Sequence, residues 1–224
     1  MHYDGQQRSG HGRNASVLQV GDDTDAHFKE GNRQASYFAR PETSAPSVDI
    51  RHLYPFRWVT NRGRVNAMSV RNAEPAEIPQ LARIWFDAWQ DAHAQILPAE
   101  LARIRTLESF ADRLRSALAE TRVAGSHDAP VGFCIVRNDE LYQLFVAASA
   151  RGTGVAADLL VDAEARLTRR GCETAWLACA IGNERAARFY EKHGWSNVGT
   201  VVSQLDTPNG IFPLEVWRYE KRLR

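Results

Sequence analysis

The segment Arg151-Gly152-Thr153-Gly154 constrains the fold most, because it separates an apolar extended run at 141–146 from a run with helical periodicity at 155–170. Two glycines without side chains let the chain turn tightly and let backbone N–H groups approach a ligand closely. The first helical turn adds unpaired N–H donors and the positive end of the helix dipole. The segment therefore predicts a strand, a loop and a helix N-terminus that together bind an anion, with phosphate the best-suited ligand.

Two other interpretations of this loop are open on local grounds. An ordinary tight turn needs the same glycines, and Gly152-x-Gly154-x-x-Ala157 also fits a dinucleotide-binding fingerprint with Glu173 about twenty residues on. The dinucleotide interpretation is disfavoured, because residues 147–150 separate the strand from the loop and Glu173 precedes the next strand instead of following it.

Composition excludes several classes of protein. The 224 residues allow one or two domains, and 28 Lys plus Arg against 27 Asp plus Glu give no broad basic field for a nucleic acid. No apolar run reaches the roughly 18 residues that cross a membrane, and the polar first residues do not form a secretory signal. Cys134, Cys172 and Cys179 lack the spacing of a metal site or a disulfide framework, so we expect no metal and a cytoplasmic protein.

The first part of the chain differs from the rest. Residues 1–66 are polar with isolated apolar clusters, which predicts a disordered or loosely attached N-terminal extension before a folded domain at 67–224. A transit peptide is disfavoured by Asp22, Asp23 and Asp25. Initiation of translation at Met68 is a further alternative.

Periodicity after residue 66 predicts an ordered series of elements. We expect a strand at 68–71, helices at 78–94, 98–104 and 109–120, a loop at 125–128, and hairpin strands at 131–136 and 141–146. After the glycine loop we expect a helix to 170, a strand at 174–179, a helix capped by Asn183, and strands near 197–202 and 212–220 joined by a turn at 208–210. This order predicts an α/β fold with a mixed sheet and helices on both faces.

Two motifs carry a resemblance to a known family. Residues 151–156 match the pattern Q/R-x-x-G-x-G/A, and Asn183-x-x-Ala186-x-x-Phe189-Tyr190-x-x-x-Gly194 is similar to a second signature in the correct order and separation. Residues 68–224 thus resemble the GCN5-related N-acetyltransferase (GNAT) superfamily. The resemblance implies an α+β mixed fold with a mostly antiparallel central sheet, and an acetyl-CoA-dependent N-acetyltransferase that acts on a primary amine of a small molecule or peptide by direct attack in a ternary complex. A non-catalytic acyl-CoA-binding module is the alternative, and a homodimer is left open.

The resemblance also implies sites for the acetyl-CoA donor. The pyrophosphate would bind Arg151, Gly152, Thr153, Gly154, Val155 and Ala156. The pantetheine arm would pair with the backbone of Phe145, Val146 and Ala147, and the Val146 N–H would polarise the thioester carbonyl. Asn183 would contact the arm or simply cap its helix, and Arg188 would reach a phosphate or remain a solvated side chain.

Catalytic and acceptor residues follow in the same way. Tyr190 would protonate the departing thiolate, with a role as a core aromatic as the alternative. Relatives often carry a glutamate base at the positions of Tyr142 or Gln143; the nearest carboxylate here is Glu140, which could act through a water or be a solvated hairpin residue. Four residues would line the acceptor site: Trp85, Trp89, His93 and Ile96. His93 is also a candidate base, although a lone histidine at a helix end is usually exposed.

Overall fold

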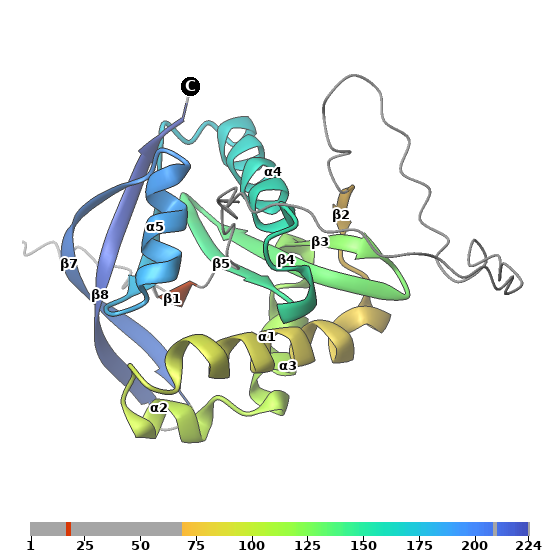
Figure 1. Cartoon of the computed structure of the whole chain (residues 1–224), viewed down its shortest axis with the longest axis horizontal. Coiled ribbons are helices and arrows are strands. Elements are labelled where there is room, and N and C mark those ends of the chain that lie inside the picture. The colour runs from red at the N-terminus through yellow and green to blue at the C-terminus, as the bar shows by residue number, and fades with distance from the viewer. Residues whose placement is uncertain (1–16, 19–68, 208–209, 224) are drawn as a thin grey trace, which may run out of the picture. The chain divides into compact units, whose positions relative to one another are not determined.

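The computed structural model describes residues 17–18, 69–207 and 210–223 (Figure 1). Apart from residues 17–18, the predicted extension at 1–66 lies outside the described residues, and so do Met68 and two residues of the predicted turn at 208–210. The strands are β1 (Val17–Leu18), β2 (Val70–Asn72), β3 (Thr121–Ser126), β4 (Ala129–Arg137), β5 (Glu140–Val146), β6 (Thr174–Ala180), β7 (Ser196–Thr207) and β8 (Gly210–Arg222). The α-helices are α1 (Ile78–His93), α2 (Ala99–Ile104), α3 (Leu107–Ser116), α4 (Val155–Arg169) and α5 (Glu184–Lys192).

The strands form one mixed, mostly antiparallel sheet, as predicted. Its order is β2-β3-β4-β5-β6-β8-β7, and every neighbouring pair along this path is antiparallel except β5 and β6, which are parallel. The short β1 lies off this path and pairs in parallel with β6. The only parallel pair along this path is therefore formed by two strands that each lead into a helix, β5 into α4 and β6 into α5.

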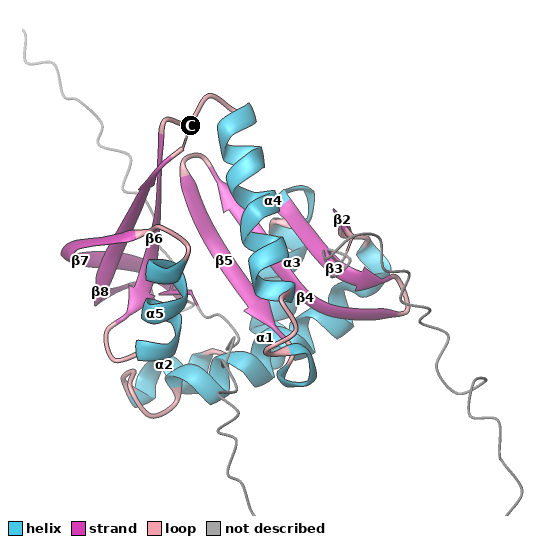
Figure 2. Cartoon of the chain, turned by 45° about the horizontal axis from the view of Figure 1, so that its top comes forward, coloured by secondary structure: helices cyan, strands magenta, loops and turns pink. Residues whose placement is uncertain are grey.

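Helices cover both faces of the sheet (Figure 2). On one face α4 and α5 bury a core against β4, β5 and β6 that includes Leu144, Leu159 and Leu177. On the other face α1 and α3 pack against β3, β4 and β5 around Trp85, whose ring centroid lies 4.8 Å from that of Phe110. A third cluster joins α2 to β6, β7 and β8. Burial of each large side chain contributes roughly 1.5–3 kcal/mol, so the amphipathic pattern of the helices is what fixes them to the sheet.

Four elements differ from the sequence-based expectation. The predicted helix at 109–120 ends as α3 at Ser116, and the strand β3 follows it where no strand was predicted. Only Val123 and Ala124 of β3 are buried and apolar, so its own pattern is weak, and antiparallel pairing with β2 and β4 on both sides stabilises it. The last two strands are also longer than predicted, because they pair with each other along almost their whole length.

Candidate functional site

The strands β5 and β6 diverge. They pair at a single position, Glu140 with Trp176, near the start of each strand. Beyond that point the edge of β6 at Ala178 and Cys179 pairs with β1 instead. The carboxyl ends of β5 and β6 are therefore parted, and both strands lead from there into loops that start helices.

A β-bulge in β5 accounts for the divergence. Gln143 pairs with Ile135 of β4 and Leu141 with Val136, so Tyr142 has no partner residue in the register. Such an extra residue bends its strand and increases the local twist. The bulge thus turns the second half of β5 away from β6 and directs Tyr142 into the core beneath α1 and α3.

The end of β5 presents a backbone donor to this gap. The N–H of Ala147 donates to the carbonyl of Val131 on β4 at 2.8 Å. Successive residues of an antiparallel strand turn their N–H groups to opposite edges, so the Val146 N–H points away from β4, toward the side of β6. This geometry favours Val146 over Ala147 as the donor to a ligand in the gap.

The loop after β5 has the backbone of an anion site. Gly152 and Gly154 adopt φ angles of 74° and 88°, in the left-handed region where other residues are strained. A Cβ on Gly154 would meet no atom within 4 Å, so this part of the loop borders open space. The first helical hydrogen bond of α4 runs from the Asp158 N–H to the Gly154 carbonyl at 3.0 Å. The N–H groups that precede Asp158 in the first turn therefore have no partner within the helix. The loop can therefore offer several N–H donors to a phosphate, as the sequence predicts.

Arg151 of the same loop is held by α1. Its Nη2 lies 2.7 Å from Oδ2 of Asp91, an exposed carboxylate near the end of α1. At the other side of the gap, a Cβ on Gly182 would lie 3.5 Å from the side chain of Ile96, just after α1. The end of α1 therefore contacts both the β5–α4 loop and the β6–α5 loop. Sequence patterns gave no signal for Asp91, because its partner is 60 residues away.

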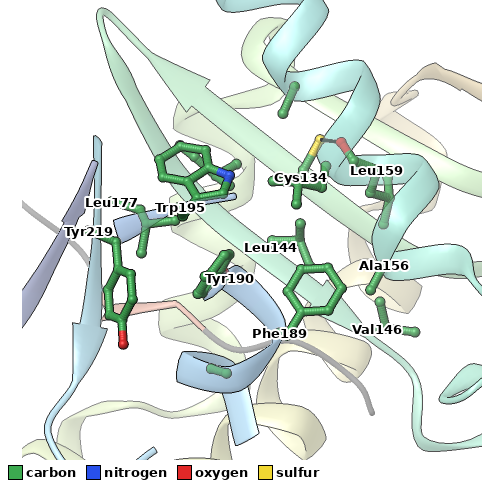
Figure 3. Close-up of a cluster of buried hydrophobic side chains, with 14 of the residues drawn as sticks. Cys134, Leu144, Val146, Ala156, Leu159, Leu177, Phe189, Tyr190, Trp195 and Tyr219 are labelled. Carbon is green, nitrogen blue, oxygen red and sulfur yellow. Dashed lines mark hydrogen bonds between the residues drawn. The ribbon is translucent and has the colours of Figure 1, made fainter. Parts of the chain in front are cut away.

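Asn183 and Tyr190 lie on α5, on the face that also carries α4. The Asn183 side chain accepts a hydrogen bond from the Ala186 N–H at 3.2 Å, so Asn183 caps the helix as its sequence pattern predicts. Tyr190 is fully buried among Phe189, Trp195 and Tyr219 (Figure 3), and its hydroxyl has no hydrogen-bond partner within the described ranges. Buried hydroxyls nearly always have a partner, so this one has capacity to donate to a ligand.

The environment of Tyr190 keeps its proton in place. Burial raises the pKa of Tyr190 well above its usual range, and Cys179 and Cys134 add smaller effects in the same direction. The same burial raises the pKa of the Cys179 thiol to about 12. A thiolate released beside Tyr190 would experience a similar increase and would accept a hydrogen bond or a proton from the phenol.

The structure changes the expectation for Glu140. Glu140 is not a solvated hairpin residue, because its side chain is buried, and it lies where β5 and β6 are still paired. Six residues of extended strand separate it from Val146, which corresponds to roughly 20 Å. That separation argues against Glu140 as the base at a thioester held by Val146.

The predicted acceptor residues are mostly buried. Trp85 and Trp89 belong to the core beneath α1, whereas Ile96 is about one-third exposed at 37%. His93 is fully buried, contrary to the usual expectation for a lone histidine at a helix end. Its Nδ1 lies 3.2 Å from the Trp89 carbonyl, which can only accept, so Nδ1 carries the proton and Nε2 keeps its lone pair. Burial lowers the pKa of His93 to about 3, with a smaller contribution from the charge of Arg185, and the ring is neutral.

Other kinds of site receive no support in the described part of the chain. No group of three or more His, Cys, Asp or Glu side chains there could hold a metal ion. No helix among residues 69–207 and 210–223 is long and apolar enough to cross a membrane.

Residues 78–195 match the sequence profile of the acetyltransferase (GNAT) family. The chain is also 33% identical over 118 residues to uncharacterized N-acetyltransferases of Mycobacterium tuberculosis and Mycobacterium bovis, covering 50% of this chain and 72% of each relative. The profile spans β4, the glycine loop, α4 and α5, and so includes both sides of the gap.

Solved structures show the same fold. A GCN5-related N-acetyltransferase from Rhodopseudomonas palustris superposes with a TM-score of 0.57 at 22% identity, covering 70% of this chain and 97% of that one. A PaiA N-acetyltransferase from Thermoplasma acidophilum in complex with coenzyme A gives 0.53 at 20% identity, covering 69% and 98%. The apo form of YjaB from Escherichia coli gives 0.51 at 27% identity, covering 68% and 96%.

Proposed function

Because the chain belongs to the acetyltransferase (GNAT) family, and is thus an N-acetyltransferase, we propose that it moves the acetyl group of acetyl-CoA to a primary amine of a small molecule or peptide by direct attack in a ternary complex. One observation carries the proposal: the carboxyl ends of β5 and β6 are parted, and a glycine loop and the N-terminus of α4 follow the end of β5. We assign the activity to a domain at 67–224 and treat residues 1–66 as an extension to it.

The donor binds along the gap in this proposal. Backbone N–H groups of residues 152–156 and the dipole of α4 hold the pyrophosphate, and Arg151 adds a positive charge. The pantetheine arm follows β5 past Phe145 and Val146, and there it would take the place beside β6 that β1 fills in this structure. Exposed Arg188 on α5 is a secondary phosphate contact.

The chemistry then needs few side chains. The amine nitrogen attacks the thioester carbon, a C–N bond forms, and the C–S bond breaks. The Val146 N–H points into the gap and stabilises the charge that develops on the carbonyl oxygen. Tyr190, whose hydroxyl has no other partner in the described ranges, donates to the departing sulfur. The amine must arrive without its extra proton, because only the neutral form carries the lone pair.

Steady-state kinetics with a panel of amines would test the proposal. We expect release of free CoA that depends on the amine, with intersecting double-reciprocal lines typical of a ternary complex. Parallel lines would refute direct attack. Tight binding of acetyl-CoA by calorimetry without turnover on any amine would instead support a binding module.

A further inference from the structure

Three arginines from three different elements surround the phenol of Tyr142. Nη2 of Arg113, on α3, donates to the Tyr142 hydroxyl oxygen at 3.1 Å. The guanidinium carbon of Arg137, at the end of β4, lies 3.8 Å from the centre of the Tyr142 ring. Arg105, the residue that ends α2, is close enough to interact electrostatically with both Arg113 and Tyr142. Tyr142 occupies the β5 bulge, so this cluster lies beside the start of the gap.

Arg105 is the unusual member of the cluster. It is only 8% exposed, yet its guanidinium forms no hydrogen bond or ion pair with any residue in the described part of the chain. Four other partly buried arginines contact a carboxylate: Arg71 with Glu77, Arg122 with Asp162, Arg151 with Asp91, and Arg218 with Glu220, whereas Arg166 bonds the Glu120 carbonyl. Asp206 on β7 attracts Arg105 electrostatically. No ion pair in the described residues therefore takes up the donors of Arg105, which leaves its guanidinium able to bind an anion.

The local potential is positive. Burial, the largest effect on Tyr142, raises the pKa of its phenol, but the charges of Arg113 and Arg137 and the Arg113 hydrogen bond outweigh it, and the pKa is lowered overall. Burial and the neighbouring charge of Arg113 lower the pKa of Arg105 to about 10, so Arg105 is still protonated at neutral pH. Both shifts are those expected where positive charges outnumber negative ones.

Arg105 lies on the face of the sheet opposite the proposed donor site. It follows α2, which packs on β6, β7 and β8, and it interacts with Tyr142 in the core between α1, α3 and β5. Arg105 therefore lies where the two halves of the sheet part, on the face opposite α4 and α5. The proposed donor site uses α4 and α5, so we expect the acceptor to bind on the other face, where Arg105 lies.

We propose that Arg105, supported by Arg113, binds an anionic group of the acceptor, so that the enzyme acetylates small amines that carry a carboxylate or a phosphate. The proposal rests on the proposed acetyl transfer and specifies its substrate class. A guanidinium matches both oxyanions with two parallel hydrogen bonds. The same cluster disfavours polycationic amines, because its three positive charges outnumber the two carboxylates that act on it, Glu140 and Asp206.

Acceptor pairs that differ only in the anionic group would test the proposal. We would compare α- and ω-amino acids with their amides, and aminoalkyl phosphonates with the corresponding amino alcohols, at saturating acetyl-CoA. We expect kcat/KM to be about 10- to 100-fold higher for the anionic member, the range given by one or two charge-assisted hydrogen bonds. The better of the carboxylate and phosphonate series identifies the preferred anion. Equal rates within every pair would overturn the proposal and leave acetyl transfer intact.

Variants at Arg105 would test whether this residue causes the preference for anionic acceptors. Arg105→Met should remove the preference for the anionic member, and Arg105→Lys should restore part of it, while the KM for acetyl-CoA stays unchanged. Arg103→Met is the matched control, because Arg103 is exposed on the same helix and bonds only the Ala99 carbonyl at 3.3 Å. An Arg105→Met enzyme that keeps the full preference would refute the assignment.

A measurement of acceptor binding distinguishes failure of the Arg105 site from failure of acetyl transfer. The preferred anionic amine should raise the melting temperature of the wild type and not that of Arg105→Met, whether or not turnover occurs. No turnover with any amine would refute acetyl transfer, whereas a thermal shift that is the same in both proteins would refute the Arg105 site.

Discussion

Two glycines at opposite ends of α4 allow a matched test of the phosphate loop. Gly154 precedes the helix with a φ of 88°, and Gly171 follows it with a φ of 79°. A Cβ at either position would meet no atom within 4 Å, so neither alanine variant suffers a clash. Only Gly154 belongs to the loop that we expect to hold the pyrophosphate.

The expected loss of stability is the same for both variants. A non-glycine residue in the left-handed region costs roughly 1–2 kcal/mol, and alanine restricts the unfolded chain by about 0.4–1 kcal/mol in the opposite direction. The net destabilisation is about 1 kcal/mol, which corresponds to a decrease of roughly 2–4 °C in melting temperature for a domain of this size. Gly154→Ala and Gly171→Ala should therefore melt at similar temperatures.

The expected effect on the donor differs between them. A methyl group at Gly154 extends into the open space beside the loop and keeps a phosphate from at least one backbone N–H. Loss of one hydrogen bond to a charged group costs about 1.5–3 kcal/mol, equivalent to a 10- to 150-fold higher Kd. Calorimetric titration with CoA should show this for Gly154→Ala and an unchanged Kd for Gly171→Ala. Equal affinities in the two variants, with equal melting temperatures, would show that the loop does not bind the cofactor.

Two further predictions concern buried rings. Tyr190→Phe should lower kcat at least 10-fold without lowering the melting temperature, because the lost hydroxyl has no partner in the described residues; full turnover would remove Tyr190 from the mechanism. The pKa of His93 in the folded protein, about 3, lies below its ordinary value of 6.5. As pH decreases, the unfolded chain therefore binds a proton at His93 before the folded protein does, and the free energy of unfolding falls below pH 6.5. The loss should be about 2 kcal/mol at pH 5 by denaturant unfolding, and His93→Gln should unfold with a weaker dependence on pH over that range.

Local patterns were sufficient for much of the fold. The helix at Ile78–His93 and the hairpin of β4 and β5 follow from apolar residues at regular spacing, and each lies within a few residues of its predicted bounds. The strand β3 and the bulge at Tyr142 were not predictable in this way. Both are defined by which residues face each other across strands, and that register depends on the assembled sheet.

The candidate site likewise contains some residues that local patterns predict and others that they do not. The glycine loop and the Asn183 cap are contiguous segments whose backbone conformation is set locally, so a motif reveals them. The burial of His93 and of Arg105 arises from packing between α1, α2, α3 and the sheet. No short pattern around Arg105 distinguishes it from the exposed Arg103 two residues earlier.

The charges that this packing brings together also bear on the absence of a glutamate base at Tyr142 or Gln143. The groups around the proposed acceptor site are positive at Arg105, Arg113 and Arg137 and neutral at His93, and they outnumber the carboxylates of Asp206 and Glu140, which act on Arg105 and Tyr142. Like charges disfavour a bound ammonium ion, so we infer that the cluster lowers the pKa of the acceptor amine and makes a strong base unnecessary.

The dependence of kcat on pH reports the bound complex and tests this inference. For wild type the inflection should lie below the solution pKa of the amine, by about one unit for each 1.4 kcal/mol of repulsion. In Arg105→Met it should move toward the solution value, and in the control Arg103→Met it should not move. An inflection at the solution pKa in all three proteins would mean that the arginines hold the anionic group without assisting the loss of the proton, and that a base elsewhere must receive it.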